Sequence, residues 1–320
     1  VNVRGRHLTF INGMSANERH AALANWRRLK MDEYHPTETP DAWIVTVINN
    51  RADRVPRSQV FARMLVQDLS ADRHFLIGTN LDGLQSYIDH AWQQRLESES
   101  FADQDRQALL EALDRYAHQL RVVTTDQALL DRTQAMLRGL GHTPPPGPDS
   151  LGEQDTLAQF CDAVEMDSDI ADGVLAHWQE NALELTQFRE LRQALESGSG
   201  GYERLQDVLS VWFKRRVVVL PNSHATGDEV IRDIVGDTPP GLETRMMGMQ
   251  NIKGTGLDFI YRWQSWDRHY QDGRMLLSRD PDSVLAAARN LAAVEDFGWL
   301  DFDYFRPLLV QAMEMTTNQT

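Results

Sequence analysis

The sequence contains a single cysteine, Cys161, among 320 residues. One thiol cannot close a disulfide within the chain, so nothing indicates an oxidising compartment. No apolar run approaches the roughly 18–20 residues that a membrane-spanning helix needs, and no basic start leads into an apolar stretch as in a signal peptide. We therefore predict a cytoplasmic protein with no transmembrane segment, which would reach the inner face of a membrane only through partners.

Positive charge is also scarce. The chain has 32 Lys and Arg against 47 Asp and Glu, which gives a net charge of −15. This balance argues against nucleic acid as a partner, because binding to a phosphate backbone requires a cationic surface. A local cluster of arginines in so acidic a chain is therefore informative. The length and the 42% hydrophobic content are those of a globular protein with a sizeable core.

Several catalytic motifs are missing. No G-x-x-x-x-G-K-[ST] phosphate loop occurs, so the chain has no nucleotide site of that type. No G-x-S-x-G nucleophile elbow occurs either. The ten histidines show neither H-E-x-x-H nor another paired spacing typical of metal ligands, so we predict no metal site.

Strands and helices alternate over the first hundred residues and again after residue 215. Runs rich in β-branched and aromatic residues predict strands, and apolar residues at helical spacing predict the helices between them. We expect strands at 7–11, 42–48, 74–77, 216–220 and 245–249, and helices at 15–30, from Pro56, at 81–96, at 228–235 and from about 257. Single helices between strands favour right-handed crossovers and a parallel sheet.

The pattern changes between about residues 101 and 213, where helical signals occur with almost no strand signal. We predict an α/β fold with an open parallel Rossmann-like sheet, a large all-α insertion and a helical C-terminal tail. The sheet domain would be discontinuous, over 1–98 and 214–270. The insertion would span 99–213 and the tail 271–320.

Polar, small or basic residues follow all five predicted strands. In an open parallel sheet, ligands bind beyond the carboxyl ends of the strands, so these residues are site candidates. Turn chemistry alone also favours Asn and Gly at such places. The substrate-binding candidates are Asn12, Asn17, Asn49, Asn50, Arg51, Asp53, Arg54, Arg57, Asn251 and Lys253.

The end of the second strand carries three arginines within seven residues, Arg51, Arg54 and Arg57. Guanidinium groups hold carboxylates or phosphates in two-pronged pairs. Asp53 could orient one of them or bind an ammonium group. A solvated helix start with an internal Arg–Asp pair is the alternative, but cations there oppose the helix dipole. We predict that the loop 49–54 binds an anionic ligand.

The turn Gly254-Thr255-Gly256 leads into a predicted helix. Backbone N–H groups at such a turn can hold a phosphate group. The third glycine of a dinucleotide-binding fingerprint is missing, and a tight turn before a helix explains the two glycines equally well.

Four segments resemble a known family, the Mur-type amide ligases, and most closely the C-terminal domain in the ligase subunit of poly-γ-glutamate synthase. FINGMSANE at 10–18, followed by a helix with Trp26, is similar to the start of that domain. NNRADR at 49–54, with its continuation at 57–62, resembles the Asn-Cys-Arg-Ala-Asp-Arg segment of the same subunit. FLIG at 75–78 matches the next strand, and GMQNIKG at 248–254 resembles a Gly-x-Gly-Asn-Ile-x-Gly segment. The resemblance covers about 7–95 and 216–262.

The resemblance implies an activity. The family activates a carboxylate with ATP as an acyl phosphate, which an amine then attacks, and the C-terminal domain closes over ATP held in a central domain. ATP and Mg are therefore implied for the full ligase, with no cofactor bound by this chain alone. Glutamate is the implied amino acid, and an ATP-binding region N-terminal to Val1, or a partner subunit, would be missing.

The family's residues carry over by position. Asn12 and Asn17 would shape the first loop, and Asn251 and Lys253 would face the arginine loop. Arg51, Asp53, Arg54 and Arg57 would hold the amino acid or the acyl-phosphate oxygens.

Three functions follow from these observations. The leading hypothesis is the substrate-positioning domain of an ATP-dependent acid–amino acid ligase, inactive alone. The second is a stand-alone α/β binding or regulatory module whose helical insertion engages a partner protein. The third is a hydrolase or transferase acting on a phosphorylated small molecule.

Overall fold

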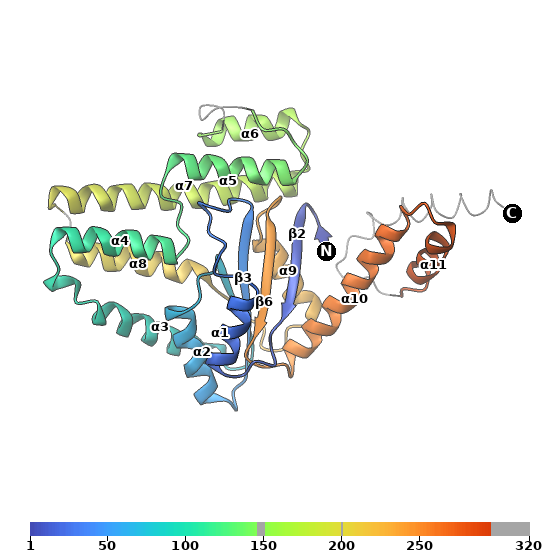
Figure 1. The fold of residues 1–320 in the computed structure, drawn as a ribbon, viewed down its shortest axis with the longest axis horizontal. Helices are drawn as coiled ribbons and strands as arrows, with labels where there is room; N and C mark the ends of the chain where they lie inside the picture. Colours follow the sequence, from blue (N-terminus) through green and yellow to red (C-terminus); the bar gives the residue numbers. More distant parts are fainter. Residues whose placement is uncertain (146–150, 200, 296–320) are drawn as a thin grey trace.

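The computed structural model describes residues 1–145, 151–199 and 201–295, and one six-stranded sheet forms its centre (Figure 1). The strands are β1 (Asn2–Val3), β2 (Arg6–Asn12), β3 (Ala42–Asn50), β4 (Arg73–Gly78), β5 (Val217–Val219) and β6 (Glu243–Met249). Their order across the sheet is β1-β2-β6-β3-β4-β5, and only β1 runs antiparallel to its neighbour. The predicted open parallel α/β sheet is confirmed, and the short strand β1 was not predicted.

The middle of the sheet is fully buried. Every residue of β3 and β4 is buried, as expected for parallel strands covered on both faces. The strand β6 comes last in the chain but lies between β2 and β3. Its Met246 pairs with Phe10 on one side and with Val45 on the other.

Helices cover both faces of the sheet. One face carries α1 (Arg19–Arg28), α2 (Val55–Gln67) and α3 (Leu81–Ser98), and the other carries α9 (Gly227–Asp237) and α10 (Thr255–Met275). Because successive strand residues point to opposite faces, Ile44 and Leu76 join a core with Phe61 of α2. Val45 joins the second core with Phe259 of α10.

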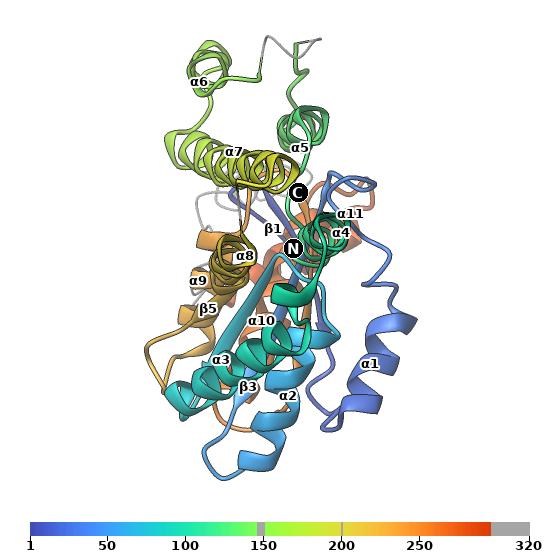
Figure 2. The same ribbon diagram turned by 90° about the vertical axis from the view of Figure 1, so that its left-hand side faces the viewer.

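The chain between α3 and β5 is helical, as predicted. It forms the 3-10 helix η1 (Phe101–Asp103), α4 (Arg106–Gln119), α5 (Asp126–Gly139), α6 (Gln154–Ala163), α7 (Ser168–Ser197) and α8 (Tyr202–Arg216). Figures 1 and 2 show α5, α6 and α7 stacked beyond the amino ends of the strands. The Asp167 side chain accepts N–H groups from Asp169 and Ile170 and so caps the start of α7, which follows α6.

The last described helices extend away from the sheet. The helix α10 leads to α11 (Pro281–Ala292), which lies outside the body of the molecule (Figure 1). A small separate cluster of Leu276, Val284, Ala287 and Leu291 joins them. Part of the predicted tail, 296–320, lies outside the described residues, as does 146–150, part of the stretch 141–150 whose four prolines predict a linker. Within the described ranges, no helix is long and apolar enough to cross a membrane.

A buried ionic network joins the helical region to the amino ends of the strands. Asp72 accepts hydrogen bonds from Arg121 Nε at 2.8 Å and from the Ile44 N–H at 2.7 Å, and Arg132 lies 3.6 Å away. Burial alone would raise the pKa of Asp72, but the guanidinium groups of Arg121 and Arg132 hold it below its usual range. The charge pair is therefore kept ionised inside the protein.

Two further arginines extend this network. Arg73 binds Glu180 at 2.6 Å and Asp237 at 2.8 Å. Arg216 makes two bonds of 2.8 Å to Glu184. These pairs connect β4 to α7 and α9, and the end of α8 to α7, so the helical region is tied to the sheet by desolvated charges.

Candidate functional site

The carboxyl edge of the sheet lies opposite the helical region. Helices α1, α2, α3 and α10 follow β2, β3, β4 and β6 and begin at this edge. Their N-terminal N–H groups have no partners within the helices, so this edge attracts anions. The predicted site residues lie here.

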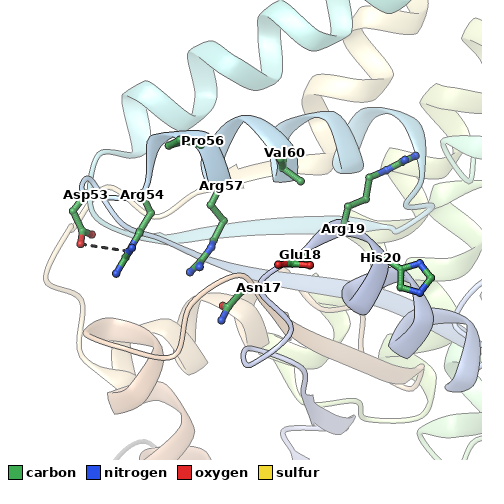
Figure 3. Close-up of a pocket in the computed structure, with 9 residues that line it drawn as sticks. All are labelled: Asn17, Glu18, Arg19, His20, Asp53, Arg54, Pro56, Arg57 and Val60. Carbon is green, nitrogen blue, oxygen red and sulfur yellow. Dashed lines mark ion pairs between the residues drawn. The ribbon is translucent and has the colours of Figure 1, made fainter.

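A cavity of about 750 Å³ opens between the first turns of α1 and α2. Its lining residues are Asn17, Glu18, Arg19, His20, Asp53, Arg54, Pro56, Arg57 and Val60. In Figure 3, Arg54 and Arg57 point from α2 toward the side of the cavity that carries Asn17. Four predicted residues, Asn17, Asp53, Arg54 and Arg57, are thus brought together.

The charges in this cavity are of both signs. Arg54 lies 3.6 Å from Asp53, and both side chains are more than half exposed, so little of the arginine charge is neutralised. Arg19 instead binds Asp68 through two bonds of 2.8 and 2.5 Å, which raises its pKa. The free cationic character thus comes from Arg54 and Arg57, and Glu18 adds a carboxylate at the start of α1.

Neither helix beside the cavity has a side-chain cap at its N-terminus, although Glu18, the N-cap residue of α1, places a carboxylate there. Both α1 and α2 lack an acidic residue in the first turn and a side-chain cap hydrogen bond. Uncapped N–H groups and two guanidinium groups favour a carboxylate or phosphate, while Glu18 and Asp53 can accept an ammonium group. An α-amino acid carries both kinds of group.

Asn49 belongs to β3 and not to the following loop, which corrects the predicted strand end at residue 48. Its Nδ2 donates to the carbonyl oxygens of Asn251 and Lys253, both at 2.8 Å. Asn251 Nδ2 donates back to the Asn49 carbonyl at 3.0 Å. Both side chains are buried, and this reciprocal pair fastens the end of β3 to the loop after β6.

Asn50 is buried as well and is also the last residue of β3. Its Oδ1 accepts from Ser58 Oγ at 2.6 Å and from Gln250 Nε2 at 2.9 Å. Its Nδ2 donates to the carbonyls of Thr79 and Asn80 at 2.9 and 3.1 Å. Asn49, Asn50, Ser58, Gln250 and Asn251 form what we call the amide network, which holds three strand ends and α2 in place.

Among the other predicted residues, Arg51, Asn12 and Lys253 do not line the cavity, whereas Arg57 lines it and also contacts the amide network. Arg51 donates to Asp53 at 2.8 Å, as the internal-pair alternative predicted. Arg57 donates to Asn251 Oδ1 and so connects the cavity with the amide network. Asn12 is exposed and accepts from the N–H of Met14, and Lys253 is exposed.

The turn 254–256 starts α10, as predicted. Gly254 precedes the helix with φ of 69°, and Thr255 is its first residue. A Cβ at Gly256 would lie 2.3 Å from Asn49 Nδ2. Packing against the amide network therefore requires this glycine, and phosphate binding by Gly254, Thr255 and Gly256 stays a prediction.

Sequence reasoning missed several residues here. Glu18, Arg19, His20 and Val60 line the cavity, and Ser58 and Gln250 belong to the amide network. The first three were hidden because the helix was predicted from Ser15, whereas α1 begins at Arg19. Gln250 lies beside the predicted Asn251 and is buried with φ of 81°, which a sequence does not reveal.

The fold and the site together define an α/β protein with a cavity of mixed charge at the carboxyl edge of a parallel sheet. Its residues 1–143 match the family model described as the poly-gamma-glutamate synthase CapB C-terminal domain. A stretch of 69 residues is 39% identical to the "PGA synthase CapB" of Bacillus subtilis (strain 168). That stretch is 22% of this chain and 16% of the relative, so the chain matches about a sixth of the relative's length. No solved structure matches the chain.

The matched residues 1–143 include β2, β3, β4 and every lining residue of the cavity. They also include α4 and α5, so the similarity extends further into the helical region than the motifs indicated. They do not include β6 and the turn 250–256. The resemblance at 248–254 and the wider relation to Mur ligases stay predictions.

The resemblance implies ATP and Mg for the full ligase, which need a phosphate-binding loop and metal ligands. The sequence has no phosphate loop. Among the described residues, the group of three side chains able to hold a metal ion is His35, Glu38 and His118, none of which lines the cavity. The cavity is lined by two carboxylates, Glu18 and Asp53, and binding of ATP and Mg stays a prediction for the full ligase.

Proposed function

We propose that this chain positions an amino acid for an amide-bond-forming ligase related to poly-γ-glutamate synthesis. The cavity between α1 and α2 carries the proposal, because Arg54 and Arg57 meet two uncapped helix N-termini there with Glu18 alongside. The similarity of residues 1–143 to the CapB C-terminal domain supports it. Glutamate is the proposed amino acid.

The chemistry of such a domain is positioning. Arg54 and Arg57 bind the carboxylate groups of the amino acid, and Glu18 or Asp53 accepts its ammonium group. The amide network keeps the strand ends and the start of α2 rigid, so the arginines approach the ligand from a fixed direction. Holding an amine in line with an activated carboxyl group removes much of the entropic barrier to amide formation.

Activation of the carboxylate is assigned to another region or subunit. The chain has no phosphate loop, so ATP and Mg would be held elsewhere in the working ligase. We expect the 320-residue chain alone to bind the amino acid in the cytoplasm and to form no amide bond.

Titration calorimetry with L-glutamate tests this proposal. We expect Arg54→Ala and Arg57→Ala each to weaken binding about tenfold or more, equivalent to about 1.4 kcal/mol. Arg63→Ala is the matched control, since Arg63 is an exposed arginine of α2 that does not line the cavity. Equal affinity in the wild type and in both cavity variants, all with unchanged circular dichroism, would rule out this site.

A further inference from the structure

Two histidines and a glutamate meet on the amino side of the sheet, far apart in sequence. His35 and Glu38 lie in the connection between α1 and β3, and His118 lies in the last turn of α4. One ligand atom from each falls within 4.8 Å of the other two. The two histidines are 83 residues apart in the sequence, so no short motif contains both.

The backbone of this connection holds His35 and Glu38 on one turn. The His35 carbonyl accepts the N–H groups of Glu38 at 3.1 Å and Thr39 at 2.7 Å. The Thr39 hydroxyl also bonds to the N–H and the carbonyl of His35, both at 2.9 Å. As a result, Glu38 Oε2 lies 3.0 Å from His35 Nδ1 without any contribution from a third element.

The tautomer of His35 is set by its neighbours. Nε2 lies 3.1 Å from the carbonyl of His118 and donates to it, so Nδ1 carries a lone pair, which accepts the Thr37 N–H at 3.2 Å. Glu38 Oε2 also lies 3.0 Å from this Nδ1, so a carboxylate oxygen and an unprotonated ring nitrogen lie side by side. Metal-bound histidines commonly donate their other ring N–H to a backbone carbonyl in this way.

We propose that His35, Glu38 and His118 form a transition-metal site, with zinc as the preferred ion, that clips α4 to the connection before β3. Two imidazoles and one carboxylate are a usual zinc ligand set and leave a fourth position for water. Imidazole ligands argue against Mg²⁺ and Ca²⁺, which prefer oxygen. Ligands at about 2.0 Å from zinc lie about 3.3 Å apart, close to the 3.0 Å between Nδ1 and Oε2.

One ring must turn when the ion binds. The imidazoles of His35 and His118 stack with centroids 4.0 Å apart and an interplanar angle of 4°, so their in-plane lone pairs do not converge. His35 is buried and fixed by its bonds, whereas His118 is exposed and can rotate about its Cβ–Cγ bond. The ion also replaces the Thr37 N–H at Nδ1. The nearby Arg121 opposes a cation, but its charge is paired with Asp72.

The test is titration of the full chain with ZnCl₂, followed by calorimetry and by thermal unfolding. We expect one zinc per chain, a higher Tm in zinc, and no effect of MgCl₂. Glu38→Gln and His118→Gln change exposed side chains and should each weaken zinc binding at least tenfold, with the Tm in chelator unchanged. His90→Gln, an exposed histidine of α3, is the matched control and should bind zinc like the wild type.

Two results would overturn the proposal. One is a wild-type chain with no zinc affinity tighter than that of the combined Glu38→Gln, His118→Gln variant. The other is unchanged binding in each single variant, which would locate zinc at another place. Because Arg54 and Arg57 are untouched in all these variants, L-glutamate titrations report separately on the cavity.

Discussion

Arginine plays opposite roles at the two ends of this sheet. At the amino end, Arg73, Arg121 and Arg216 are buried and each is matched to a carboxylate. At the carboxyl edge, Arg54 is half exposed and faces a cavity. Buried pairs cannot exchange their partner for a ligand without leaving an uncompensated charge, whereas the exposed arginines can. One end of the sheet is therefore held together by buried charge pairs, whereas the other leaves arginine side chains accessible at a cavity.

The strongest test of this comparison removes a buried carboxylate. Asp72→Ala leaves Arg121 and Arg132 charged and buried without their partner, so we expect the free energy of unfolding to fall by about 3–5 kcal/mol. Urea denaturation at pH 7 measures it. Asp53→Ala, at the exposed edge, should cost less than about 1 kcal/mol. An equal loss of unfolding free energy in the two variants would contradict the difference between buried and exposed charge pairs.

The loss of stability in acid tests the same comparison, because His74 and His177 are buried beside these arginines. Burial, and then the arginines beside them, lower the pKa of each imidazole to about 3. The unfolded chain takes up these protons below about pH 6.5, while the folded chain does so only near pH 3, so stability falls as the pH drops from about 6.5 toward 3.

The expected loss is about 2 kcal/mol for each imidazole between pH 7 and pH 5. Urea midpoints measured across that range in His177→Gln should show a shallower dependence on pH than in the wild type. The control is His90→Gln, which replaces an exposed imidazole and should leave the slope unchanged. A slope in His177→Gln as steep as that of the wild type would contradict the assignment.

The smallest expected effect concerns the carboxyl edge itself. Asn49→Ala removes two donors from the buried carbonyls of Asn251 and Lys253 and should lower the free energy of unfolding by about 1–3 kcal/mol. Asn12→Ala changes an exposed residue with one local bond and should stay within about 0.5 kcal/mol. If Asn49→Ala weakened L-glutamate binding without any loss of stability, Asn49 would be a ligand contact and not part of the amide network.

The sequence predicted the sheet well, because parallel strands leave local signals. The runs at 42–48 and 74–77 are short, apolar and bounded by Asn or Gly, and they became β3 and β4. The order of the strands could not be predicted, because β6 pairs with residues more than 190 positions away in the sequence.

The site was predicted in part for a similar reason. Arg54 and Arg57 stood out as neighbours in an acidic chain, and they do line the cavity. Arg73, Arg121, Arg132 and Arg216 are spread over the chain, and no local pattern distinguishes a buried arginine from an exposed one. Asn49 and Asn50 were expected to face a ligand, but hydrogen bonds across 200 residues hold them inside.

The late arrival of β6 has a consequence for how the chain is made. A ribosome releases β2 and β3 long before residues 243–249, and until then β2 has only the two-residue β1 beside it. Until β6 is made, β2 and β3 each have an unpaired edge. Pairing over such long sequence distances slows folding, and the unpaired edges favour association with other chains. A shortened gene product ending near residue 143 would keep every cavity residue and still lack the strand that closes the sheet.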